Sequence, residues 1–331
     1  MKVIVCSGDS HTCGEGATGF DSSPELSLGV YNTNGKGSGR YSGKDARTYV
    51  NLVREAVCSL TDSQYTEVDY PELSKLYEMR TECGFMCVEK SIALNHSADM
   101  ITLEFAEKEK PATVLIYNDG VFYQRLTLHA EITRHGDWSF YTVPIFCAGT
   151  KNLEIVPESG EVYLGRVGYH KGEYAVINSG VGSCTSKRYR EECLNDFVNA
   201  FRPEIVIAEA HTINDWISGI TPEQYKENLK SLLNDIKKIT RKVYVLGVSP
   251  IMGNQEQAGG IYQDFMIASR IAAEEAGAEL IDTYQDFLKE TEGLSDEECF
   301  EKLYHDNWHV NDLGHRIYAD NIIKKIGSVL K

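Results

Sequence analysis

The chain has 331 residues, a hydrophobic fraction of 42% and a formal net charge of −16. It is long enough for one large domain or two smaller ones, and its composition is that of an ordinary globular protein. So acidic a chain is not expected to bind nucleic acid or an anionic membrane surface. No stretch approaches the ~20 apolar residues of a membrane span. The composition leaves the oligomeric state open.

Nine cysteines are scattered without the spacing of a disulfide framework or of a zinc site. The odd number predicts reduced thiols and therefore a cytoplasmic protein. The N-terminus carries one lysine and then a short apolar run that is far too brief for a signal peptide. A secreted protein whose leader had been removed would have the same sequence, so secretion is the alternative.

The first candidate site follows a short apolar run, residues 3–5, which predicts a buried strand. Gly8-Asp9-Ser10 ends this strand, and such a small-residue turn can hold a serine hydroxyl out into a cleft. Taken alone, the motif favours an ordinary turn in which Asp9 or Ser10 caps the next helix. Cys13 is an alternative nucleophile, but no base is placed for it in preference to the serine.

The segment 61–172 differs from the sequence on either side of it. After a helix predicted over residues 46–58, short strand-like segments recur between residues 100 and 167, and Asn118-Asp119-Gly120 is a hairpin signal. These features predict an inserted β-sandwich domain over residues 61–172. Aromatic side chains on its strands either stack on sugar rings or pack the core of the sandwich. These aromatics are Tyr117, Phe122, Tyr123, Trp138, Phe140 and Tyr141.

From residue 173 onward strands and helices alternate, which predicts a parallel sheet with helices on both faces. This α/β domain is discontinuous and comprises residues 1–60 and 173–331. Loops 178–186 and 212–216 each follow an apolar strand, and each can aim N–H or amide donors at an oxyanion. In such folds the binding sites lie at the carboxyl ends of the strands.

The last candidate site is a loop in which Asp306 precedes His309 by three residues. A serine nucleophile needs a general base, and the base needs a carboxylate to orient it. This one loop can supply both groups. The spacing is also frequent by chance, and a lone histidine is usually a structural residue.

Taken together and in this order, the four segments resemble the sequence blocks of the SGNH hydrolases, also called the GDSL family. The resemblance covers about residues 1–60 and 173–331. It implies a three-layer α/β/α hydrolase domain with a flavodoxin-like parallel sheet. The four blocks are Gly8-Asp9-Ser10, residues 178–186, residues 212–215 and residues 306–309.

The resemblance also implies roles for individual residues. Ser10 corresponds to the nucleophile, His309 to the base that activates it, and Asp306 to the residue that orients the base. Asn214 and the backbone N–H of Ser10 correspond to donors of the oxyanion hole. No metal and no organic cofactor is implied.

Two positions depart from the family pattern. Thr212 stands where the third block usually has glycine, and Ser183 stands where the second block usually has its oxyanion glycine. A backbone N–H does not require glycine, although glycine permits closer approach and unusual dihedral angles. The second oxyanion donor is therefore either Ser183 or the preceding Gly182.

The function implied is that of a serine esterase that forms an acyl-enzyme on Ser10. Its expected partner is an acylated carbohydrate or another small ester, and we expect a carbohydrate O-acetylesterase. The inserted sandwich is similar to what deacetylating members carry, and no long apolar lid suggests a lipid substrate. Trp216 and Trp308 flank two of the blocks and either line a substrate pocket or pack the loops. The alternatives are a lipase or thioesterase, and a sugar-binding protein with a vestigial hydrolase domain.

Overall fold

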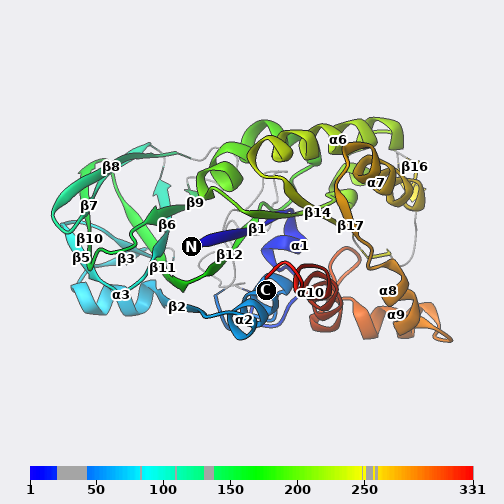
Figure 1. Cartoon of the computed structure of the whole chain (residues 1–331), viewed down its shortest axis with the longest axis horizontal. Coiled ribbons are helices and arrows are strands. Elements are labelled where there is room, and N and C mark those ends of the chain that lie inside the picture. Colours follow the sequence, from blue (N-terminus) through cyan, green and yellow to red (C-terminus); the bar gives the residue numbers. More distant parts are fainter. Residues whose placement is uncertain are drawn as a thin grey trace.

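The computed structural model describes residues 1–20, 43–82, 84–108, 110–129, 138–247, 249–250, 256–257 and 260–330. Two groups of elements lie side by side, with the β-rich segment at one end and the α/β part at the other (Figure 1). The side chains of Trp138 and Tyr141, two of the predicted aromatics, lie outside what is described. None of the described helices combines the length and the apolar character that a membrane crossing demands.

The α/β part is built on five parallel strands in the order β12-β1-β13-β14-β17. The first strand, β1, lies inside this sheet. The chain next adds β12 on one side of β1, and then β13, β14 and β17 on the other side. Such a reversal of strand order creates a crevice at the carboxyl ends of the strands, where ligands bind in open α/β sheets. The strands are β1 (Lys2–Gly8), β12 (Tyr174–Gly180), β13 (Ile205–Glu209), β14 (Lys242–Leu246) and β17 (Glu279–Ile281).

Helices cover both faces of this sheet, as the alternation of strands and helices predicted. Successive side chains of a strand point to opposite faces. Val3 and Val5 accordingly belong to one apolar core, whereas Ile4 and Cys6 belong to the other. The first core is closed by η2 (Tyr189–Val198), a π-helical segment, with η3 (Asn199–Phe201), α6 (Pro222–Ile239) and α7 (Tyr262–Ala276). The second is closed by α2 (Tyr49–Leu60), α8 (Tyr284–Thr291), α9 (Asp296–Leu303) and α10 (Asp312–Ile326).

Short elements follow the strands at their carboxyl ends. They are α1 (Ser10–Cys13), α4 (Ser186–Arg188), α5 (Thr212–Ile217) and the hairpin of β15 (Glu256–Gln257) with β16 (Gly260–Ile261). Three of them begin within predicted sequence blocks: α1 at Ser10, α4 at Ser186 and α5 at Thr212. The fold therefore brings these blocks to one edge of the sheet.

The segment between α2 and β12 forms two antiparallel sheets that contribute to one apolar core. Leu103 and Ile145 enter this core from one sheet, and Val114 and Ile155 enter it from the other. The larger sheet contains β2 (Ser63–Asp69), β3 (Thr81–Glu82), β4 (Phe85–Cys87), β6 (Met100–Lys108), β9 (Trp138–Phe146) and β11 (Tyr163–Gly172). The smaller contains β5 (Ile92–Asn95), β7 (Ala112–Asn118), β8 (Val121–Leu128) and β10 (Asn152–Ser159), and helix α3 (Tyr70–Tyr77) follows β2.

The predicted aromatics of this segment divide between interior and surface. Phe140 is buried against Phe85, with stacked rings 5.4 Å apart. Phe122 and Tyr123 lie exposed on β8, which is the edge strand of the smaller sheet. Core packing thus accounts for Phe140, and the two β8 aromatics remain available to a ligand.

Candidate active site

Ser10 is held at the turn between β1 and α1. Asp9 caps α1, because its Oδ1 accepts the backbone N–H of His11 at 3.0 Å. Gly8 must be a glycine, since a Cβ there would lie 2.1 Å from Oγ1 of Thr12 and 2.6 Å from Cβ of Glu209. This close approach fixes the turn, and Ser10 retains 8% of its surface exposed.

The loop that precedes α10 brings a histidine to this serine. Nε2 of His309 lies 2.9 Å from Oγ of Ser10, and Nδ1 of His309 lies 2.9 Å from Oδ2 of Asp306. Oδ1 of Asp306 also accepts the backbone N–H groups of Trp308 and His309, both at 2.8 Å. The structure therefore brings Ser10, His309 and Asp306 together in the order in which a nucleophile, a base and an orienting carboxylate are needed.

The charges around His309 favour its protonated form. Burial lowers the pKa of His309, but the hydrogen bond to Asp306 and the negative charge of Glu15 outweigh burial and raise it overall. Burial raises the pKa of Asp306, but the hydrogen bond from His309 and its charge dominate and hold that pKa well below its usual range. An ionised Asp306 accepts the Nδ1–H of His309, which leaves Nε2 free to accept the Ser10 proton.

Asn214 lies on α5, directly above the end of β13. Its Nδ2 donates to Oδ2 of Asp9 at 2.6 Å, and its side chain is buried. A side-chain amide has two N–H donors, so this bond orients the group and leaves the second donor for an oxyanion. The amide is thus tied to the residue next to Ser10, as an oxyanion donor would have to be.

The second block contributes a structural clamp and a loop. Nδ2 of Asn178 donates to the backbone oxygen of Thr12 at 2.7 Å and so anchors α1. Ser183 has a φ of 56°, in the left-handed region that glycine favours. The backbone N–H of Gly182 faces the thiol of Cys13. Of the two candidate donors, this geometry favours Ser183.

The model of the GDSL-like lipase/acylhydrolase family matches residues 156–317, which include Asn214, Asp306 and His309. Over these residues, just under half of its length, the chain is similar to the GDSL-like lipase/acylhydrolase family. That similarity implies a hydrolase of the esterase class. No curated protein matches the sequence.

Solved structures resemble this chain at low sequence identity. A peptidoglycan O-acetylesterase is 14% identical, with 100% of this chain and 91% of that chain covered and a TM-score of 0.50. An acetylxylan esterase from Geobacillus stearothermophilus is 20% identical, with 46% and 73% covered and a TM-score of 0.39. An alpha/beta hydrolase from the metagenome of Lake Arreo, Spain, is 20% identical, with 46% and 73% covered and a TM-score of 0.40. The match to the peptidoglycan O-acetylesterase structure supports a shared fold over the whole length of this chain.

Sequence reasoning missed a buried carboxylate beneath the serine turn. Glu209 accepts the backbone N–H of Asp9 at 2.9 Å and that of His211 at 2.7 Å. It thereby joins the turn after β1 to the turn after β13. A charged residue at the end of the apolar run Ile205–Ala208 is the signal that could have found it.

A second missed residue, His11, follows the serine directly. Its Nδ1 lies 3.2 Å from Oδ1 of Asp9, and its Nε2 lies 2.9 Å from the backbone oxygen of Trp308. His11 is buried, and its ring centroid is 5.3 Å from that of His309. It therefore connects the serine turn to the histidine loop.

The two tryptophans proposed for a substrate pocket differ in position. Trp216 is fully buried, and its Nε1 donates to the backbone oxygen of Gly260 at 2.9 Å. Its ring packs 6.0 Å from that of Trp308, which is half-buried. Trp216 thus packs the loops because a hydrogen bond and an aromatic contact hold it inside, and Trp308 alone of the pair reaches the surface.

Two carboxylate–histidine groups have the proximity that a metal site requires. One comprises Asp9, Glu209 and His211, and the other comprises Glu15, Asp306 and His309. Hydrogen bonds within the serine site already engage the carboxylates of Asp9, Glu209 and Asp306. We assign neither group to a metal.

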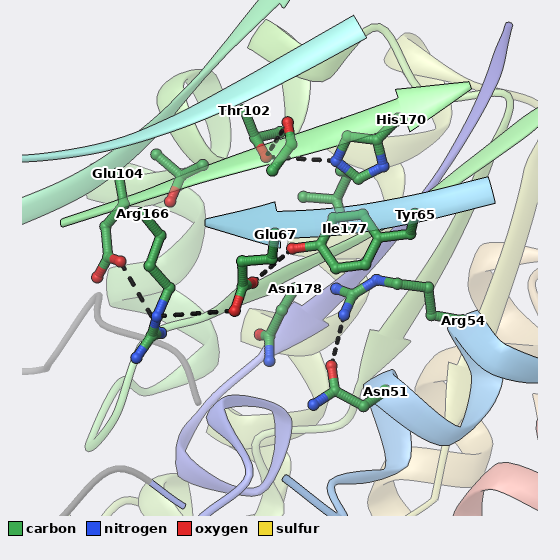
Figure 2. Close-up of a pocket in the computed structure, with 12 residues that line it drawn as sticks. Asn51, Arg54, Tyr65, Glu67, Thr102, Glu104, Arg166, His170, Ile177 and Asn178 are labelled. Atoms are coloured by element: carbon green, nitrogen blue, oxygen red, sulfur yellow. Dashed lines mark hydrogen bonds and ion pairs between the residues drawn. The ribbon is translucent and has the colours of Figure 1, made fainter. Parts of the chain in front are cut away.

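A polar cavity of about 50 Å³ lies where the β-rich segment meets the edge strand β12. Figure 2 shows Arg54 of α2 and Arg166 of β11 on its walls, with Asn178 of β12 beside them. Arg54 donates to the backbone oxygen of Val176 at 3.1 Å, and its guanidinium lies over the ring of Tyr65. The first contact satisfies one backbone oxygen on the edge strand that carries the second block.

Proposed function

We propose that this chain is a serine esterase in which Ser10 is the nucleophile, His309 the general base and Asp306 the residue that orients it. The observation that carries the proposal is the continuous chain of contacts from Asp306 through His309 to Ser10, each link 2.9 Å long. The last link joins Ser10 and His309, which are 299 positions apart in the sequence, at the crevice of the sheet. An intact arrangement of this kind speaks against a vestigial hydrolase domain.

The reaction follows from this geometry. Oγ of Ser10 attacks the ester carbonyl carbon while Nε2 of His309 takes the serine proton. The oxyanion then rests against the N–H groups of Ser10 and Ser183 and the amide of Asn214. His309 returns the proton to the departing alcohol, and water releases the acid from the acyl-enzyme in a second cycle. Loss of one oxyanion donor typically lowers kcat on the order of a hundredfold or more.

For the substrate, we propose an acetyl ester of a carbohydrate. The comparison that supports this choice is the peptidoglycan O-acetylesterase, whose alignment covers the whole of this chain, including residues 61–172. We further propose that these residues form an inserted β-sandwich domain, because their two antiparallel sheets contribute to one apolar core. The exposed aromatics Phe122 and Tyr123 on β8 give this domain a surface on which sugar rings can stack.

The test is the release of acetate from acetylated sugars and xylan fragments, beside simple esters of increasing acyl length, by the wild type and by Ser10→Ala. We expect activity confined to acetyl groups on sugars and its loss in the variant. A preference for long acyl chains would move the protein to the lipases or thioesterases. Activity unchanged by Ser10→Ala would refute the serine mechanism.

A further inference from the structure

Glu15 carries a carboxylate that reaches the reacting side of the histidine. Oε2 of Glu15 lies 3.4 Å from Nε2 of His309, the same nitrogen that lies 2.9 Å from Oγ of Ser10. Asp306, in contrast, contacts the opposite ring nitrogen, Nδ1. The imidazole is therefore placed between two carboxylates, only one of which the esterase mechanism uses.

The backbone of Glu15 is fixed at this position. Its N–H donates to the backbone oxygen of Ser10 at 3.0 Å, and its own oxygen lies 3.1 Å from Nε2 of His315. Burial lowers the pKa of His315 to about 3, so this histidine is neutral and donates from Nε2 while Nδ1 accepts the N–H of Tyr49. Two elements, α1 and α10, thus hold the backbone of Glu15, and α2 orients the histidine that contacts it.

Two glycines with left-handed backbone flank Glu15. Gly14 has a φ of 108° and Gly16 a φ of 93°. A Cβ on Gly16 would lie 2.2 Å from the backbone oxygen of Val310, the residue after His309. Only a glycine lets the chain approach the histidine loop so closely. The close approach brings the Glu15 carboxylate to Nε2.

We propose that Glu15 is a specificity-determining residue of the active site, which accepts a hydrogen bond from a hydroxyl group of the alcohol part of the ester. The leaving oxygen must come within hydrogen-bond reach of Nε2, since His309 returns its proton there. Groups on the neighbouring carbons of the alcohol then pass beside Oε2 of Glu15. Burial raises the pKa of the Glu15 carboxyl, and the charge of His309 opposes that rise. In its ionised form the carboxylate only accepts hydrogen bonds, so it selects hydroxyl-bearing alcohols and repels anionic ones. This role rests on the proposed serine esterase function.

Glu15 also acts on the charge of the histidine. Its negative charge is one of the causes that raise the pKa of His309, so its removal lowers that pKa. Other charged or titratable groups in the surrounding elements also act on Glu15 and His309. Replacement of Glu15 leaves these groups in place. They are Asp306 on the histidine loop, Asp9 and His11 at the serine turn, and His315 on α10.

The experiment compares kcat/KM on two acetates for Glu15→Gln, Glu15→Ala and Glu15→Asp. One is an acetylated methyl xyloside with free neighbouring hydroxyls, and the other is cyclohexyl acetate, a ring ester without them. Loss of a hydrogen bond to a charged group predicts a fall of about 10- to 100-fold on the xyloside for Glu15→Ala, with little change on cyclohexyl acetate. Glu15→Asp keeps a carboxylate, so its kcat/KM on the xyloside falls less than that of Glu15→Ala. In the Gln and Ala variants the acid limb of the pH profile moves to lower pH.

Glu301→Gln, which removes the same charge from the exposed face of α9, is the matched control and stays at the wild-type rate on both esters. Thermal unfolding of each variant separates misfolding from a loss of selectivity. Equal losses on the two esters without a shift of the acid limb, or no loss on either, would overturn the role of Glu15. A wild type inactive on both esters, or Ser10→Ala as active as the wild type, would overturn the esterase function itself and with it this inference.

Discussion

At the scale of single residues, Ser183 shows how a departure from a family pattern can be accommodated. Its φ of 56° is the backbone conformation for which the family glycine is suited. A side chain in this region costs on the order of 1–2 kcal/mol relative to glycine, which the rest of the fold must offset. The sequence left Gly182 and Ser183 as alternatives because a count of positions cannot reveal a dihedral angle.

Asp306 allows a pH prediction at the same scale. The ester bond is attacked only when His309 is neutral, and its pKa lies above the ordinary value of 6.5. We therefore expect kcat/KM to fall on acidification, with half of its maximum at a pH above 6.5. Asp306→Asn removes a charge that raises this pKa, so the acid limb moves to lower pH, and kcat falls on the order of a thousandfold or more. An acid limb that stays in place would show that another group controls it.

At the scale of elements, the serine turn and the turn that carries Asn214 are joined by a buried network. Glu209 binds the N–H groups of Asp9 and His211, and Asp9 in turn accepts the amide of Asn214. Burial raises the pKa of Glu209 well above its usual range, whereas hydrogen bonds from His11 and the charge of that ring outweigh burial at Asp9 and lower the pKa there. Burial thus favours the neutral form of Glu209, whereas the contacts with His11 favour the ionised form of Asp9.

Replacement of Glu209 tests this network. Glu209→Ala leaves two buried N–H groups without an acceptor, which predicts a loss of about 2–6 kcal/mol in the free energy of unfolding. Glu209→Gln keeps one acceptor oxygen and is expected to lose less. Urea unfolding monitored by circular dichroism measures both values. Equal stability of the Ala variant and the wild type would mean that water replaces the carboxylate.

The sequence predicted the elements better than the links between them. Apolar runs that end in small or polar residues placed Ser10 and Asn214 after strands, because strand and turn preferences are local. The contacts of Glu209 and Glu15 were not predictable in this way. They join residues about 200 and 300 positions apart, and such contacts leave no periodic signal in a single sequence.

At the scale of the whole molecule, the site depends on the order of strands in the sheet. Ser10 follows β1, which lies between β12 and β13, whereas His309 precedes the last described helix, α10. The serine and the histidine meet only when the sheet is complete, so activity reports on the fold of the entire α/β part. The β-rich segment meets the edge strand β12 at the polar cavity of Figure 2, next to the second block. There Arg54 of α2 lies over the ring of Tyr65 and donates to the backbone oxygen of Val176.

The central claim is that Ser10 becomes acylated. The most direct measurement is the intact mass of the protein after rapid acid quench during turnover of an activated acetyl ester, followed by peptide mapping. We predict the added mass of one acetyl group on the wild type, located on Ser10, and none on Ser10→Ala. An unmodified wild type that still releases acetate, or an acetyl group on Cys13, would contradict the account.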